Sequence, residues 1–270
     1  STFGTADGNA ARAENLTKSE GSISAYKEEV LRKMTNVNIG IVIDGTSSME
    51  KFYPAVKSAI KESIRVFDDS KYKVKVGIVI YRDYSDGEYI TEKVKLTNPG
   101  NPNLYSFLDT GGKYGIKSGS GDKTYEEALY YGINTAIDQL GFDPEQSNIL
   151  LVIGDCGNDR NDTKINRSDI VNKLTQNNIN LIGFQVRQGS ADAFGLFNNQ
   201  VGLLMKQGLE KRYASLIANT KETLTDNENN AVKIKETKDG YKLVNDDANL
   251  FVGSLNYPAQ GQEMPTAKLS

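Results

Sequence analysis

Four short apolar runs, each rich in β-branched residues, constrain the fold of this chain more than any other feature of its sequence. They span Val37–Ile43, Val74–Tyr81, Asn148–Ile153 and Ile179–Val186. Continuous apolar runs of this length are typical of parallel strands buried on both faces. Segments with the spacing of amphipathic helices lie between and after them, at residues 49–67, 128–140, 170–174 and 191–205. Strands that alternate with helices predict a doubly wound, Rossmann-like α/β fold with a mostly parallel central sheet.

The flanking segments have a different character. Residues 1–21 are small, polar and aperiodic, which indicates a leader or linker before a domain that spans 22–220. Within that domain, Tyr89–Leu96 alternates in polarity and is predicted as a short antiparallel edge strand. In residues 221–270, Asp239-Gly240 lies between two alternating runs and predicts a hairpin. We expect a loop-rich tail after it, which could lead into a further module.

Composition narrows the partners and the chemistry. With 32 basic and 35 acidic residues the net charge is -3, so the chain offers no positive field for nucleic acid or anionic lipid. Its apolar runs are far shorter than the ~20 residues of a membrane-spanning helix, and we expect no membrane insertion by this segment. The chain has no histidine and a single cysteine, Cys156, which excludes Ser-His-Asp triads and an internal disulfide. We expect Cys156 to be a small buried thiol.

No apolar leader precedes the first strand, so the sequence is expected to be a mature or excised segment whose compartment stays open.

Three oxygen-rich loops follow predicted strands or open predicted helices. We name them the Asp44 loop (residues 44–48), the glycine-rich loop (118–124) and the Asp155 loop (154–157). Ligands of open α/β sheets bind at the carboxyl edge of the strands, where such loops meet. Carboxylates and hydroxyls, with no histidine or thiolate, are the ligands of a hard cation: Mg²⁺ or Mn²⁺, with Ca²⁺ as a third possibility. The candidate metal ligands are Asp44, Thr46, Ser48, Asp122, Thr124 and Asp155.

Each loop also has a purely structural interpretation. Asp-Gly followed by hydroxyls is common turn and helix-capping chemistry, and Asp155 could serve as a cap as well. Thr124 and Glu127 fit the S/T-x-x-E capping box of a helix that begins near Tyr125, which favours capping over direct metal binding for Thr124.

These loops resemble the metal-ion-dependent adhesion site of the von Willebrand factor type A (VWA) domain family. The family's DxSxS loop is matched by Asp44, Thr46 and Ser48, with a threonine in place of the first serine. Asp122 lies in GSGD, which is similar to the GGGD of an alpha-kinase-associated subgroup, and Asp155 ends the run LLVIGD. Tyr81-Arg82-Asp83 is similar to the YRD segment of the same subgroup. The resemblance covers residues 36–215.

The resemblance implies a non-enzymatic module that binds a protein partner through the metal. The hydroxyls would bind the ion directly, some carboxylates would bind it through water, and an acidic side chain of the partner would complete the octahedron. Ionised Asp44, Asp122 and Asp155 would leave a divalent site with a charge of about -1, which favours the metal and weakens attraction for a partner carboxylate. Analogy with the family also favours an extracytoplasmic location.

Two other functions remain open. IVIDGT and GDCGND are similar to motifs of haloacid-dehalogenase-like phosphatases, but Val42 stands where that chemistry needs an aspartate nucleophile. The second alternative is a scaffold of the same fold that binds partners without a metal. For Arg82 and Asp83, the alternatives are a surface ion pair worth under ~1 kcal/mol and a role in bracing a loop.

Overall fold

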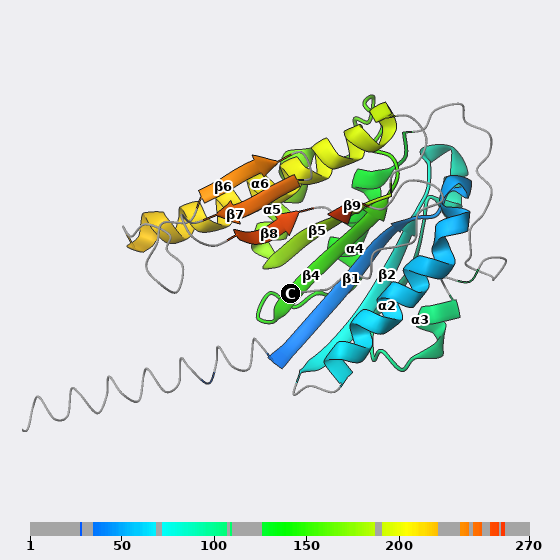
Figure 1. The fold of residues 1–270 in the computed structure, drawn as a ribbon, viewed down its shortest axis with the longest axis horizontal. Helices are drawn as coiled ribbons and strands as arrows, with labels where there is room; N and C mark the ends of the chain where they lie inside the picture. Colours follow the sequence, from blue (N-terminus) through cyan, green and yellow to red (C-terminus); the bar gives the residue numbers. More distant parts are fainter. Residues whose placement is uncertain are drawn as a thin grey trace, which may run out of the picture.

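The computed structural model describes residues 28, 35–68, 72–106, 109, 126–186, 191–220, 233–237, 240–244, 249–253 and 255–256. Its centre is a six-stranded sheet in the order β3-β2-β1-β4-β5-β9 (Figure 1). The strands are β1 (Asn36–Asp44), β2 (Lys73–Tyr81), β3 (Thr91–Thr97), β4 (Ser147–Gly154), β5 (Ile179–Gln185) and β9 (Leu255–Asn256). Neighbouring strands run parallel except β2 and β3. The predicted Rossmann-like fold with one antiparallel edge is confirmed.

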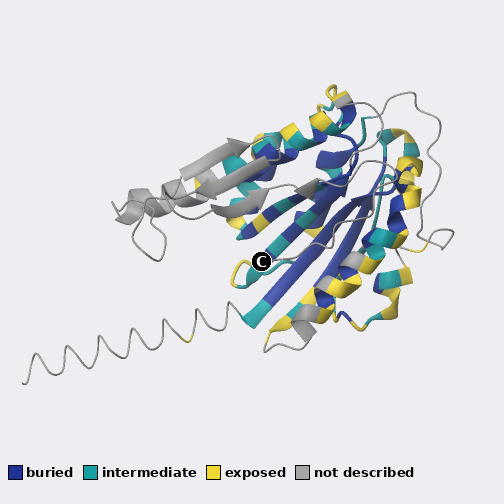
Figure 2. Cartoon of the chain, in the orientation of Figure 1, coloured by how far each residue is buried: buried dark blue, intermediate teal, exposed yellow. Residues whose placement is uncertain are grey.

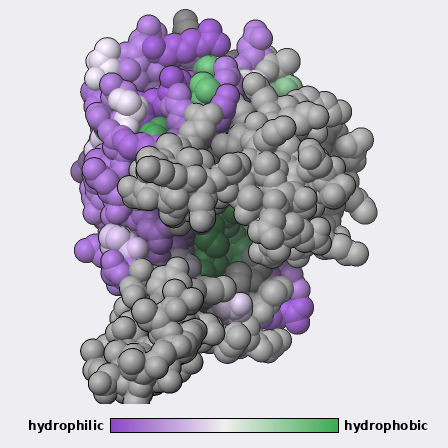
Figure 3. Space-filling view, turned by 90° about the vertical axis from the view of Figure 1, so that its left-hand side faces the viewer, coloured by the Kyte–Doolittle hydropathy of each residue, from purple (hydrophilic) through white to green (hydrophobic). Residues whose placement is uncertain are grey.

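Helices cover both faces of the sheet. They are η1 (Ser47–Phe52), α2 (Tyr53–Asp68), η2 (Tyr84–Tyr89), α3 (Pro102–Ser106), α4 (Leu129–Gln139), α5 (Arg167–Gln176) and α6 (Ala191–Thr220). One core cluster joins α2 to the face of β1 that carries Ile41 and Ile43. The other joins α4, α5 and α6 to the opposite face, which carries Val42. The central strands are therefore buried on both sides, as Figure 2 shows for β1, β2 and β4, whereas the described surface in Figure 3 is mainly hydrophilic.

The first predicted helix, expected from residue 49 on the spacing of its apolar residues, begins as a different kind of helix. A 3₁₀ helix occupies residues 47–52, and the α-helix begins only at Tyr53. Pro54 is the second residue of α2. Because proline has no N–H to donate, it fits the first turn of a helix but not its interior. The apolar spacing of Met49 continues that of α2, so periodicity alone could not separate the two helices.

The C-terminal segment contributes strands of its own. β6 (Lys233–Thr237), β7 (Gly240–Val244) and β8 (Asn249–Gly253) form an antiparallel sheet, which lies beside α6 in Figure 1. β6 and β7 pair across the position where Asp239-Gly240 predicts a turn. Part of the segment expected to be a loop-rich tail forms strands instead. β8 pairs with β7, and β9 pairs with the edge of β5. The proposed division into leader, domain and tail stays a prediction.

None of the described helices is long and apolar enough to cross a membrane.

Candidate metal centre

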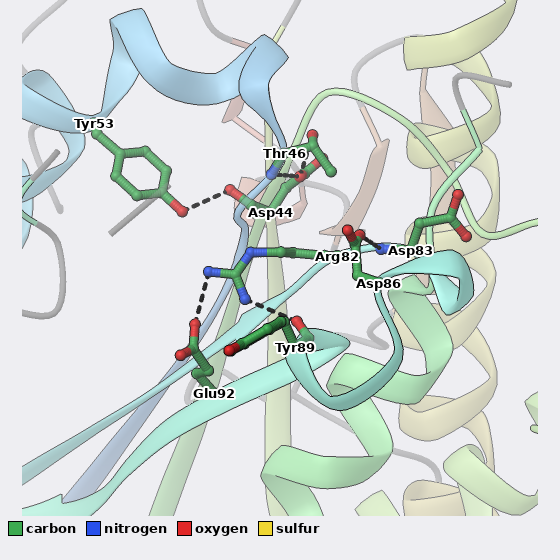
Figure 4. Close-up of polar contacts among 8 residues, drawn as sticks. All are labelled: Asp44, Thr46, Tyr53, Arg82, Asp83, Asp86, Tyr89 and Glu92. Atoms are coloured by element: carbon green, nitrogen blue, oxygen red, sulfur yellow. Dashed lines mark hydrogen bonds and ion pairs between the residues drawn. The ribbon is translucent and has the colours of Figure 1, made fainter. Parts of the chain in front are cut away.

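The Asp44 loop leaves the end of β1 and is fixed by its own backbone. Gly45 N donates to Tyr81 O at 2.8 Å, which ties the loop to the end of β2. Asp44 Oδ1 accepts hydrogen bonds from Thr46 N at 2.8 Å and Thr46 Oγ1 at 2.6 Å (Figure 4). Thr46 Oγ1 is in turn hydrogen-bonded to Ser48 Oγ at 3.1 Å. The three candidate ligands of this loop therefore form one connected group of oxygens.

Asp155 lies beside this group because β1 and β4 are parallel neighbours. Their register pairs Ile43 with Ile153, so the residues that follow emerge at the same edge of the sheet. Asp44 is fully buried and Asp155 is nearly so. Burial raises the pKa of Asp44 well above its usual value, and the charge of Asp155 raises it further. Asp44 Oδ2 receives no hydrogen bond within the described residues.

The other two candidate ligands cannot be placed. Asp122 and Thr124 fall in residues 110–125, outside the described part of the chain. The structure does locate the following helix: α4 begins at Leu129, and its N-cap Ala128 makes no side-chain cap. The expected helix start near Tyr125 is therefore wrong. Glu127 lies before the helix instead of in its first turn.

The sequence interpretation missed Glu127 as a site residue. Its backbone bridges to the last residue of the Asp155 loop and to the chain just beyond it: Glu127 N donates to Gly157 O at 3.1 Å, and Asp159 N donates to Glu127 O at 3.0 Å. Burial, followed by the charges of Asp44, Asp83 and Asp155, raises the pKa of Glu127 to about 10. The S/T-x-x-E pattern of Thr124 and Glu127 was the one feature of the sequence that drew attention to Glu127, and it indicated a helix cap instead of a site residue.

Tyr81-Arg82-Asp83 supports the rim of the site from the end of β2. Arg82 is fully buried; its Nη2 forms an ion pair with Glu92 Oε2 at 2.8 Å, and its Nη1 donates to Tyr89 O at 2.8 Å (Figure 4). Asp83 caps η2, and its N–H donates to Asp86 Oδ2 at 3.0 Å. Of the two alternatives for Arg82, the surface ion pair is wrong, because Arg82 is buried and points inward under the 84–89 loop. The loop-bracing interpretation agrees with these contacts.

The thiol beside Asp155 is held in its neutral form. Cys156 is buried, as expected. Burial and then the charge of Asp155 raise its pKa to about 12. These effects outweigh the backbone hydrogen bond of Gly157, which lowers the pKa, so the environment disfavours a thiolate nucleophile. Val42, at the position where a phosphatase would need its aspartate, is packed in the core.

The donor set of the described residues fits a hard cation. It combines two carboxylates, Asp44 and Asp155, with the hydroxyls of Thr46 and Ser48. Within the described ranges, no three histidine, cysteine, aspartate or glutamate side chains are grouped so as to hold an ion. A metal site built from the described residues alone would therefore need hydroxyl ligands as well. The unsatisfied Asp44 Oδ2, facing a second buried acid, is the kind of atom that a cation would satisfy.

The raised pKa values predict that the metal-free protein loses stability as pH rises. The folded state holds protons on Asp44 and Glu127 that the unfolded chain releases above about pH 4–4.5. Each group contributes at most about 1.4 kcal/mol per pH unit, in a window that extends for Glu127 to its folded pKa of about 10. Urea unfolding in EDTA at pH 5.5, 7 and 8.5 should show decreasing free energies of unfolding, and saturating Mg²⁺ should reduce the decrease. Constant or increasing stability in EDTA would contradict this charge arrangement.

Strand order, helices on both faces and oxygen-bearing loops after β1 and β4 define the class of this protein as a VWA domain. The chain belongs to the TssR VWA family: residues 20–270 match the model described as "TssR protein VWA domain". VWA domains are generally protein-interaction modules. The match confirms the VWA domain without singling out the alpha-kinase-associated subgroup.

Other comparisons show more distant similarity. No curated protein matches the chain. Proximal thread matrix protein 1 from the mussel byssus is 11% identical over 66% of this chain and 46% of its own, with a TM-score of 0.40. The pilus adhesin SpaC from Lactobacillus rhamnosus GG, in its open conformation, is 13% identical over 79% of this chain and 36% of its own, with a TM-score of 0.44. A second SpaC structure is 13% identical over 69% of this chain and 30% of its own, with a TM-score of 0.46. The chain thus spans less than half of each of these proteins.

Proposed function

We propose that this domain binds a protein partner through a divalent cation, Mg²⁺ or Mn²⁺, held at the carboxyl edge of its sheet. The observation that carries the proposal is the pair of buried acids Asp44 and Asp155, with Asp44 Oδ2 lacking any hydrogen-bond donor in the described residues. Two buried carboxylates that face each other repel when both are ionised, and a cation between them removes the repulsion. Membership of the VWA family supports the interaction role.

The ligand arrangement follows from the chemistry of the loops. Thr46 and Ser48 would supply hydroxyl oxygens, and Asp44 and Asp155 would bind directly or through water. Asp122 and Thr124 would add oxygens from the glycine-rich loop. In this scheme the alpha-kinase-associated subgroup, with its similar YRD and GGGD segments, provides a pattern for the site.

The partner would complete the coordination with an oxygen ligand, for which an acidic side chain is our candidate. The net charge of the metal-bound site limits how strongly it attracts such an acidic side chain. With Asp44, Asp122 and Asp155 ionised, a divalent ion leaves a charge of about -1, so a partner carboxylate is attracted less than the ion itself. We propose no enzymatic step.

Calorimetry and thermal unfolding test the proposal. Titration with Mg²⁺ or Mn²⁺ should release or absorb heat and raise the melting temperature above that in EDTA. At a free metal concentration of 100 times Kd the gain in stability should be about 2.7 kcal/mol. NaCl at matched ionic strength is the control. Absence of heat and of any melting shift at millimolar metal would reject the metal site and favour the metal-free scaffold.

A further inference from the structure

Three of the buried polar atoms that lack a hydrogen-bond partner, in the described part of the chain, belong to residues of the candidate site or to residues on which its charges act. They are Asp44 Oδ2, the Tyr81 hydroxyl and Glu127 Oε2. A buried polar atom left unsatisfied destabilises a protein, so such atoms are rare without a bound water or ion. Of the three, only Asp44 belongs to the ligand set considered so far. Tyr81 and Glu127 need a role of their own.

The fold places the Tyr81 hydroxyl beside Gly154, where the charges of Asp44 and Asp155 act on it. β1 and β2 are parallel, and their register pairs Asp44 with Tyr81. The Tyr81 side chain is fully buried and reaches toward β4, where its hydroxyl lies 2.6 Å from the position of a Cβ built on Gly154. Gly154 directly precedes Asp155. A side chain at position 154 would therefore collide with the hydroxyl, whereas glycine leaves it room.

Glu127 approaches the same place from the chain entering α4. Its backbone hydrogen bonds to Gly157 and Asp159 fix it beside the Asp155 loop. Asp44 and Asp155 are among the groups whose charges act on its carboxyl. Yet in the described residues the acids are not grouped closely enough to coordinate one ion together. Glu127 is thus near the site without being placed as a direct ligand.

We propose that Glu127 and Tyr81 are positioning residues that hold the water ligands of the bound cation, Glu127 as an acceptor and Tyr81 as a hydrogen-bond partner. The inference rests on the proposed metal site. Mg²⁺ in particular keeps several waters when it binds to proteins, so its affinity depends on groups that fix those waters. Such outer groups change metal affinity by about 10–100-fold when mutated.

The test compares Glu127→Gln with Glu126→Gln in the full chain. Glu126 is the adjacent carboxylate, 25% exposed, and pairs with Arg160. Calorimetry with Mg²⁺, Mn²⁺ and Ca²⁺ should show that Glu127→Gln weakens Mg²⁺ and Mn²⁺ binding about tenfold or more. Ca²⁺ should lose less, because it accepts more direct protein oxygens in a flexible geometry. Glu126→Gln should stay within about twofold of the wild type for all three ions.

Several results would overturn the inference. Unchanged Mg²⁺ affinity in Glu127→Gln would do so, as would equal losses for all three ions, which would indicate a charge effect without held waters. Tyr81→Phe serves as the second variant, with a several-fold loss of Mg²⁺ affinity expected and none of the fold by circular dichroism. If the wild type binds no metal, the proposed function fails together with this inference. If the wild type binds metal and both variants bind it with the same affinity, only this inference fails.

Discussion

Replacing Asp44 by alanine should abolish the stabilisation that Mg²⁺ or Mn²⁺ gives to this domain while the fold remains. Asp44 contributes a fully buried carboxylate whose second oxygen receives no hydrogen bond in the described residues, so a cation would satisfy that oxygen. In the metal-free protein, burial and Asp155 raise its pKa and make the charged side chain unfavourable. Thermal unfolding of the variant should give the same melting temperature in EDTA and in metal concentrations that stabilise the wild type by about 2.7 kcal/mol.

Asp44→Asn separates the charge from the local hydrogen bonds. An asparagine can still accept the hydrogen bond from Thr46 N, so the Asp44 loop keeps its shape. We expect this variant to fold at least as well as the wild type in EDTA and to bind Mn²⁺ at least 100-fold more weakly, about 2.7 kcal/mol. Unchanged Mn²⁺ affinity in either variant would remove Asp44 from the site.

Of the substitutions proposed for this domain, Arg82→Ala should cause the largest decrease in the free energy of unfolding. The guanidinium is fully buried, and Glu92, its ion-pair partner, is 14% exposed. Removing one partner of a buried pair leaves the other charge uncompensated and costs about 3–5 kcal/mol. The variant also loses the hydrogen bond to Tyr89 O, which holds the 84–89 loop. Urea unfolding should show a midpoint far below that of the wild type.

A matched surface pair provides the control for Arg82. Arg65 pairs with Glu62 on α2, and both side chains are more than 60% exposed, at 71% and 62%. Arg65→Ala should leave the urea midpoint essentially unchanged. The double variant Arg82→Met, Glu92→Met should recover part of the stability lost in Arg82→Met alone, because no unpaired charge remains. Equal midpoints for Arg82→Ala and Arg65→Ala would show that the buried ion pair does not brace the rim.

The fold could be predicted because its signal is local. Strands buried on both faces need continuous apolar runs, and the runs ending at Ile43 and Ile153 are of this kind. The weaker predictions involved contacts that a single segment does not encode. β9 is two residues long and exists through its pairing with β5. The start of α4 depends on the backbone bridge between Glu127 and Asn158, which lies far away in the sequence.

The positions of four candidate ligands, Asp44, Thr46, Ser48 and Asp155, could be predicted in the same way, whereas their binding of a metal stays a prediction. Asp44, Thr46 and Ser48 lie in one turn, so their spacing alone indicated that their oxygens meet. Asp155 followed from the rule that parallel strands end at one edge. Glu127 was missed, and for Arg82 the bracing of a loop was only one of two alternatives, because burial decides the role of both residues. A glutamate before a helix and an arginine after a strand are ordinary surface residues until the tertiary structure encloses them.

A crystal grown or soaked with Mn²⁺, measured for anomalous scattering, tests the central claim most directly. The account predicts one strong anomalous peak at the carboxyl edge of the sheet, within ligand distance of oxygens from Ser48 and Thr46 or their neighbours Asp44 and Asp155. Waters bound to that ion should lie toward Glu127 and Tyr81. A structure without a peak at this edge, in which Asp44 and Asp155 are satisfied by protein groups alone, would contradict it.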